Sequence, residues 1–148
     1  MLEPGHTDIL RLTLGRELTR AGGIDANPAA VAAAAIRRHE ELTACLTPIL
    51  GRGGVAAMVT RSIHVAQREF LWLQQTRACE PDQPALERLR WSLEQQPAPI
   101  ASEGAAAVLA SFGSLLTMFI GPGLAERLLR EAWPDIVLSD SPAEKKSL

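Results

Sequence analysis

The stretch that decides the fold is Ala105–Ile120, AAAVLASFGSLLTMFI, which contains no charged side chain. It ends at Gly121-Pro122-Gly123 and is followed by the charged segment 124–133. A helix that is apolar on all sides must be covered by other helices or by a membrane. At 1.5 Å per residue the stretch spans about 24 Å, less than the roughly 30 Å hydrocarbon core of a bilayer. We therefore expect a buried central helix over about 103–120, and no membrane span.

Amphipathic segments on both sides of this stretch can supply its cover. Gly22-Gly23, the glycine-rich GRGG at 51–54 and Pro134 mark helix ends, and Asn27 before Pro28 marks a start. Pro97-Ala98-Pro99 is expected to be extended, with Ser102 capping the central helix. The shell helices are predicted over 7–22, 28–50, 55–73, 84–95 and 124–132.

Helical periodicity also predicts which side chains face the core. In the first helix the apolar positions are Ile9, Leu10, Leu12, Leu14 and Leu18. The inward residues of the later shell helices are expected to be Val55, Met58, Val59, Ile63, Ala66, Phe70, Leu73, Leu86, Leu89, Leu93, Leu124, Leu128 and Ala132.

These patterns predict an all-α fold, a compact five- or six-helix bundle around the buried central helix. The chain has 148 residues, the size of one ordinary domain. No alternating apolar run flanked by hairpin turns predicts a strand. We expect a single helical domain over 1–138 and a flexible C-terminal tail over 139–148.

Composition argues against a partner that is a polyanion. The formal net charge is −2 and the sequence pI is about 5.9, so no nucleic-acid partner is expected. Arginine provides 13 of the 15 basic residues, which indicates a GC-rich bacterial genome. The first residues, MLEPGHTDIL, lack the basic and apolar regions of a signal peptide. We expect a cytoplasmic bacterial protein.

No metal site or cofactor is expected from the histidines. Neither His39 nor His64 has a carboxylate or a second histidine three or four residues away. Both are expected to be partly exposed polar side chains. No histidine follows His64, which excludes a haem held by a proximal histidine on a later helix.

No catalytic residue is expected either. Cys45 lies within a predicted helix between Ala44 and Leu46, apolar surroundings that raise the pKa of a thiol. Cys79, like Cys45, is expected to pack as a small hydrophobic residue. The adjacent pair Glu40-Glu41 points to different sides of its helix. These observations favour a protein that is not an enzyme.

Exposed aromatic residues favour a protein-interaction or regulatory module instead. Leu71, Trp72 and Trp91 fall beside the core-facing positions of their helices, and tryptophan is enriched at the centres of interfaces. We expect these three to anchor a protein partner, with Arg61 and Arg68 at the rim. Self-association into a dimer through apolar helix faces is a further expectation.

The alternative function is a helical sensor that encloses a small apolar ligand. Small residues on the central helix leave room for such a ligand beside the helix over 55–73. The residues expected to line this pocket are Ala106, Ala110, Gly113, Met58 and Ile63.

Overall fold

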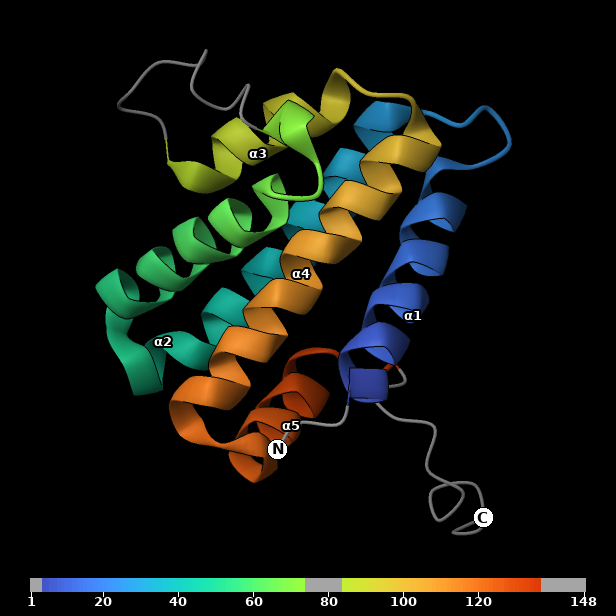
Figure 1. Cartoon of the computed structure of the whole chain (residues 1–148). Helices are drawn as coiled ribbons and strands as arrows, with labels where there is room; N and C mark the ends of the chain where they lie inside the picture. Colours follow the sequence, from blue (N-terminus) through green and yellow to red (C-terminus); the bar gives the residue numbers. More distant parts are fainter. Residues whose placement is uncertain (1–3, 74–83, 137–148) are drawn as a thin grey trace, which may run out of the picture.

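The structure, a computed structural model, describes residues 4–73 and 84–136, and within these residues every regular element is helical. The predicted tail over 139–148 and Cys79 lie outside the described residues. The bundle surrounds α4, which has α1 on one side and the second half of α2 on the other (Figure 1). The all-α prediction is thus confirmed. The helices are α1 (Pro4–Gly22), α2 (Pro28–Gln67), α3 (Ala85–Glu94), α4 (Ala98–Ile120) and α5 (Pro122–Ala132).

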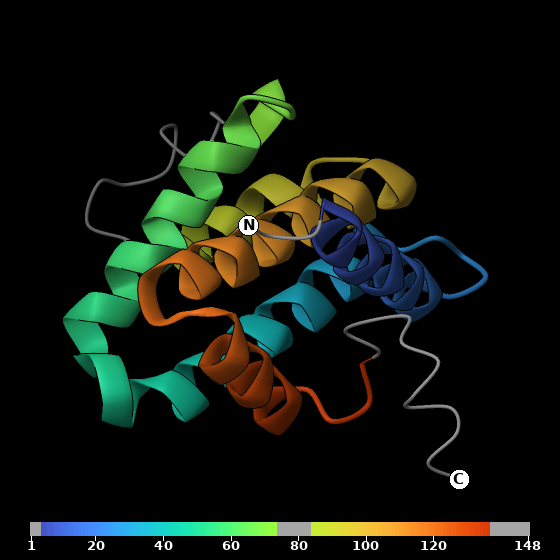
Figure 2. The same cartoon turned by 60° about the horizontal axis from the view of Figure 1, so that its bottom comes forward.

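The remaining helices close the two ends of the bundle. Helix α3 packs mainly on α2, beside the beginning of α4 (Figure 1). Helix α5 folds back below the end of α4 and contacts the first half of α2 (Figure 2). The turn between α4 and α5 is a single residue, Gly121, with φ 92°. Glycine adopts this positive φ without steric cost, so the chain reverses at once.

Helix α4 begins earlier than predicted. Its first residue is Ala98, with Pro97 as the N-cap and proline within the first turn. The expectations of an extended Ala98 and of a Ser102 cap are therefore wrong. The first amides of a helix have no intrahelical partner, so a proline there costs no hydrogen bond. Ser102 instead lies inside the helix and is buried.

The glycine-rich break inside α2 is a kink and not a loop. Only Gly51 leaves helical geometry, with φ 78° and ψ 160°, so α2 consists of a first half (28–50) and a second half (52–67). Asn27 caps its start, accepting a hydrogen bond from the Ala29 amide at 2.9 Å, as predicted. The second half ends at Gln67, short of the predicted Leu73. Residues 68–73 leave the helix because they cross over α4 toward α1.

Two core predictions are wrong. Leu12 on α1 is 59% exposed, because the inner face of that helix is taken by Leu10, Leu14 and Leu18. Leu124 on α5 is 42% exposed. Helix α5 begins directly after Gly121, and this register turns other residues inward. The buried residues of α5 are Ala125, Leu128 and Leu129.

A charge cluster around Arg38 ties the first half of α2 to α1 and to the segment after α5. The guanidinium Nε donates to Glu17 Oε1 at 2.7 Å, and Nη2 donates to Asp135 Oδ2 at 2.7 Å. Glu41 accepts from Nη1 at 3.2 Å, and Trp133 Nε1 donates to the Arg38 carbonyl at 3.1 Å. Burial by itself lowers the pKa of Arg38, but the bonds to Asp135 and Glu17 outweigh it and raise the pKa. Arg38 therefore stays charged inside the fold.

Candidate partner-binding surface

An apolar groove lies where the kink of α2 meets the end of α4. Its volume is about 530 Å³, and its one charged lining residue is Arg61. We call it the hinge groove. It is lined by Ile49, Leu50, Gly54, Ala57, Met58, Arg61, Leu115 and Phe119.

Several large apolar side chains around the hinge groove are exposed to solvent. Phe119 is 71% exposed and the adjacent Met118 is 74% exposed. Ile49, from the other side of the groove, is 51% exposed. One side of the last turn of α4 is uncovered here, because Ile120 packs on the core while Met118 and Phe119 point away from it. Clustered exposed apolar residues of this size mark an interaction surface.

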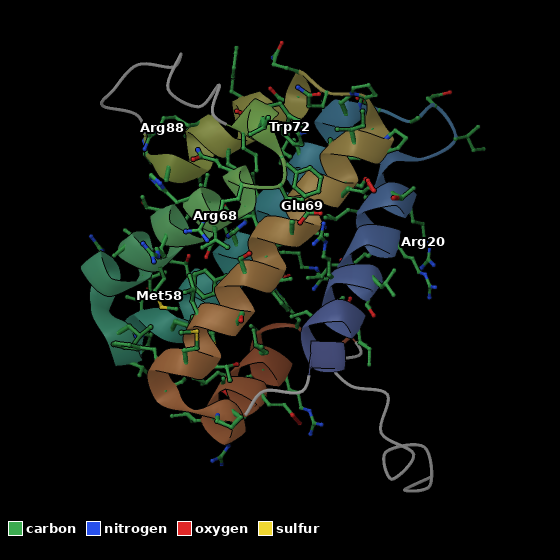
Figure 3. All side chains as sticks on the ribbon, in the orientation of Figure 1. Arg20, Met58, Arg68, Glu69, Trp72 and Arg88 are labelled. Carbon is green, nitrogen blue, oxygen red and sulfur yellow. The ribbon has the colours of Figure 1, made fainter. Side chains whose placement is uncertain are left out.

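The helix segments that form the hinge groove contain no acidic residue. Between residues 42 and 68 there is no acidic residue, and between 104 and 125 there is no charged residue. Arg61 and Arg68 are exposed, and neither has a carboxylate partner among the described residues. Arg68 is the C-cap residue directly after the second half of α2, and its φ of −63° and ψ of −33° are still helical. It is seven positions after Arg61, so the two lie on the same face. Figure 3 shows Arg68 and Met58 along this half of α2.

Trp72 is half-buried and packs against the protein itself. A Cβ atom at Gly104 of α4 would lie only 2.4 Å from Cζ2 of the indole, so the ring rests on the glycine backbone. The ring of Phe70 meets Trp72 edge-on, with centroids 6.1 Å apart. Trp72 thus contributes to the attachment of the chain after α2, whatever it contributes to a partner.

The same segment is also attached to α1. Arg11 donates two hydrogen bonds to Glu69, at 3.0 and 2.6 Å, and its guanidinium lies 5.5 Å from the centroid of the Phe70 ring. The hydrogen bonds from Arg11 lower the pKa of Glu69. We call residues 68–73 the strap, because they connect α2, α4 and α1 across one face (Figure 3).

The predicted partner-binding residues lie on two surfaces, one that runs from the hinge groove along the end of α2 and one on the outer side of α3. Arg61 lines the hinge groove, and Arg68 and the 68% exposed Leu71 follow it along the chain. Trp91 is 39% exposed, but it lies on the outer side of α3. Their role in binding stays a prediction. Sequence reasoning missed Met118, Phe119 and Ile49, because their apolar character resembles that of core residues.

The five residues predicted to line a ligand pocket do not share one hollow. Met58 lines the hinge groove, while Ile63 and Ala110 are buried. Gly113 faces α1 and α5, where an added Cβ would lie 3.2 Å from Leu10. Ala106 lines a different groove, between α1 and α4.

This second groove, the α1–α4 groove, has a volume of about 900 Å³. Ser102 lies at its wall and is 1% exposed, and its hydroxyl has no hydrogen-bond partner within the described residues. Gly15 of α1 faces Ala106 of α4 here, and a Cβ added at Gly15 would make an ordinary van der Waals contact, at 3.8 Å, with the Ala106 Cβ. The groove is lined by Arg11, Leu12, Gly15, Arg16, Thr19, Arg20, Glu69, Ser102, Glu103 and Ala106.

The two histidines differ from each other. His39 is 1% exposed and neither ring nitrogen has a partner in the described part of the chain, so the expectation of partial exposure is wrong. Its face of α2 also carries Ala35, Leu42 and Leu46, all buried. Burial lowers the pKa of His39 to about 4, which keeps the ring neutral. His64 is exposed, as expected.

Cys45 lies in surroundings that raise the pKa of its thiol, as the flanking residues in the sequence predict. Burial and the nearby Glu131 carboxylate raise the pKa of the thiol, and Sγ lies 3.6 Å from the Leu128 carbonyl oxygen. A raised pKa disfavours the thiolate, the reactive form. Across residues 4–73 and 84–136, no group of three histidine, cysteine or acidic side chains is placed to hold a metal ion.

Two of the described helices, α2 and α4, are long and apolar enough to cross a membrane by length and composition. Core helices pass the same test, and 56% of the apolar window of α4 is buried inside the protein. In α2 the corresponding share is 22%.

Comparison of the chain with protein-family models, with curated proteins and with solved structures found no match.

Proposed function

We propose that the protein is a helical interaction module whose docking surface is the hinge groove. The observation that carries this proposal is the exposure of Phe119, Met118 and Ile49 around a groove with apolar walls. Each such side chain contributes about 1.5–3 kcal/mol when it passes fully from water into an apolar contact. Their exposure is unfavourable for an isolated chain and favourable for a complex.

The shape of the site indicates what kind of element docks there. The second half of α2 and the last turns of α4 form the two walls, and Arg61 stands at one edge. A groove between two helices accepts the apolar face of a third helix, whose anchors recur at i, i+3 or i+4, and i+7. The partner element is therefore an amphipathic helix.

The experiment is photo-crosslinking from inside the groove. A photoreactive phenylalanine analogue at position 119 is expected to give a discrete protein adduct in cells that produce the protein. The control places the same analogue at Ile24, which is fully exposed on the turn between α1 and α2. Adducts that are absent at position 119, or equally abundant at position 24, would exclude the hinge groove as the docking surface.

A second candidate function is the binding of a small ligand in the α1–α4 groove. The unpartnered hydroxyl of the buried Ser102 favours it, because a buried hydroxyl without a hydrogen bond is costly. Arg16, exposed at the same groove, supplies further hydrogen-bond donors. The hydroxyl of Thr19 donates to the Gly15 carbonyl at 2.8 Å and can accept a hydrogen bond from a ligand. Native mass spectrometry is expected to show a noncovalent mass above that of the chain, which a Ser102→Ala variant loses. A native mass equal to that of the polypeptide would remove this candidate.

A further inference from the structure

We propose that α3 of a second copy of this chain docks along residues 61–68, beside the hinge groove, with its Glu87 and Glu94 against Arg61 and Arg68 of the first. This inference rests on the proposed interaction function and names a second copy of the chain as a partner. Two patterns on the chain's own surface carry it, one positive and one negative, with the same spacing.

The positive pattern lies on the second half of α2. Arg61 and Arg68 are seven residues apart, which places their helix positions about 10 Å apart on one face. Within the described helices and their caps, they are the one pair of arginines with this spacing. Val65 lies between them on the same face and is half-buried. Both guanidinium groups are available, because no described carboxylate pairs with either.

The negative pattern lies on α3. Glu87 and Glu94 are also seven residues apart, and they are the one pair of acidic residues with this spacing in the described helices. Trp91 lies between them on the same face, 39% exposed. The opposite face of α3 is buried through Leu89 and Leu93, so this stripe points away from the core of its own chain.

The two stripes complement each other in charge and length. A helix laid alongside the second half of α2 meets Arg61 and Arg68 with carboxylates two turns apart, which is the spacing of Glu87 and Glu94. Trp91 then falls between the two ion pairs, beside Val65 and close to the end of the hinge groove that Arg61 lines. A guanidinium also stacks favourably on an indole face.

The charges next to the α3 stripe permit this contact. Arg88 and Arg90 are the neighbouring cations. Arg88 is half-buried, and Nε of Arg90 lies 3.4 Å from Oε2 of Glu94. Both side chains of this pair are partly exposed, 46% and 33%, and the separation is long for an ion pair. Glu94 can therefore accept a second cation from another copy. Glu87 has no partner among the described residues.

A charge swap tests the contact directly. Sedimentation velocity of the unmodified chain is expected to show a species heavier than 15.9 kDa that grows with concentration. Arg61→Glu with Arg68→Glu, and separately Glu87→Arg with Glu94→Arg, are each expected to weaken self-association at least tenfold by opposing like charges. An equimolar mixture of the two variants restores opposite charges at every contact and is expected to restore the heavier species.

The matched control is Arg20→Glu with Arg37→Glu, which changes the net charge equally at two exposed arginines on other faces. It is expected to self-associate like the unmodified chain. Circular dichroism checks that each variant is folded, and the neutral pair Glu87→Gln and Glu94→Gln replaces the reversed pair if the latter does not fold.

Two results would overturn the inference. An unmodified chain that stays at 15.9 kDa at every concentration removes the second copy as the partner. A chain that associates, but whose swapped variants do not restore each other in the mixture, removes the α3 contact. The proposed docking function is judged separately: it survives either result if position 119 still gives a discrete protein adduct, and it fails if that adduct is lacking.

Discussion

The two halves of α2 use arginine in opposite ways. In the first half, Arg38 is buried and holds Glu17 and Asp135 with hydrogen bonds of 2.7 Å. In the second half, Arg61 and Arg68 are exposed beside apolar residues and hold no described carboxylate. A buried charge must be paired inside the protein, whereas an exposed charge is solvated by water and stays available to another molecule. Arg38 therefore belongs to the fold, whereas Arg61 and Arg68 provide a surface.

The largest effect on stability is expected from Arg38→Met. Loss of the guanidinium leaves Glu17 and Asp135 without their cation and removes the link between α1 and the chain after α5. We expect the free energy of unfolding to fall by about 3–4 kcal/mol, toward the lower part of the range for a broken buried pair, because the carboxylates are partly exposed. Urea denaturation measures it. An equal loss for Arg61→Met would contradict the distinction between the halves.

Acid is expected to destabilise the fold through His39 in the first half of α2. The pKa of His39 is about 4 in the folded protein and about 6.5 in the unfolded chain. Below pH 6.5 the unfolded chain binds the proton more readily, so stability falls as the pH drops from 6.5 to 4. The full loss is about 3 kcal/mol.

Urea denaturation at several pH values measures this effect. His39→Leu is expected to flatten the profile between pH 6.5 and 4. A profile that His39→Leu does not alter would show that other groups carry the acid sensitivity.

A smaller effect is expected where the strap meets α4. Gly104→Ala places a Cβ at 2.4 Å from Trp72 Cζ2, so the indole must move. We expect a loss of about 1–3 kcal/mol, the usual cost of overpacking. The loss is expected to shrink when Trp72→Ala is present in the same chain, because the clash is then absent. Thermal unfolding of the four members of this cycle measures the coupling, and additive effects would contradict the contact.

The smallest effect on stability is expected at the hinge groove. Phe119→Ser changes a side chain that is 71% exposed, so the free energy of unfolding is expected to change by no more than about 0.5 kcal/mol. Partner crosslinking from a photoreactive group at Met118 is nevertheless expected to be lost. Phe112→Ser, at a fully buried position of the same helix, is the contrast and is expected to destabilise strongly. A large loss from Phe119→Ser would place this side chain in the core.

Local chemistry predicted the helices well. Asn27-Pro28, Gly51 and Gly121 act through the conformations of their own backbones, so their effects are visible in the sequence. The prediction was weaker at the start of α4. Pro99 suggested an extended segment, yet the first turn of α4 accepts it. Arg61, which the sequence suggested as a rim residue, lines the hinge groove, while Phe119 was hidden within an apolar run, and the binding role of both stays a prediction.

The sequence by itself determined that this protein is all-helical, where its helices turn, and that one apolar helix lies at the centre. Those properties depend on periodicity and on glycine and proline, which act over a few residues. Only the tertiary structure decided which arginines are paired with carboxylates and that His39 is buried. It also decided that Trp72 rests on Gly104 and that Met118 and Phe119 at the end of α4 are exposed. These outcomes depend on contacts between residues far apart in the chain, and no local pattern records such contacts.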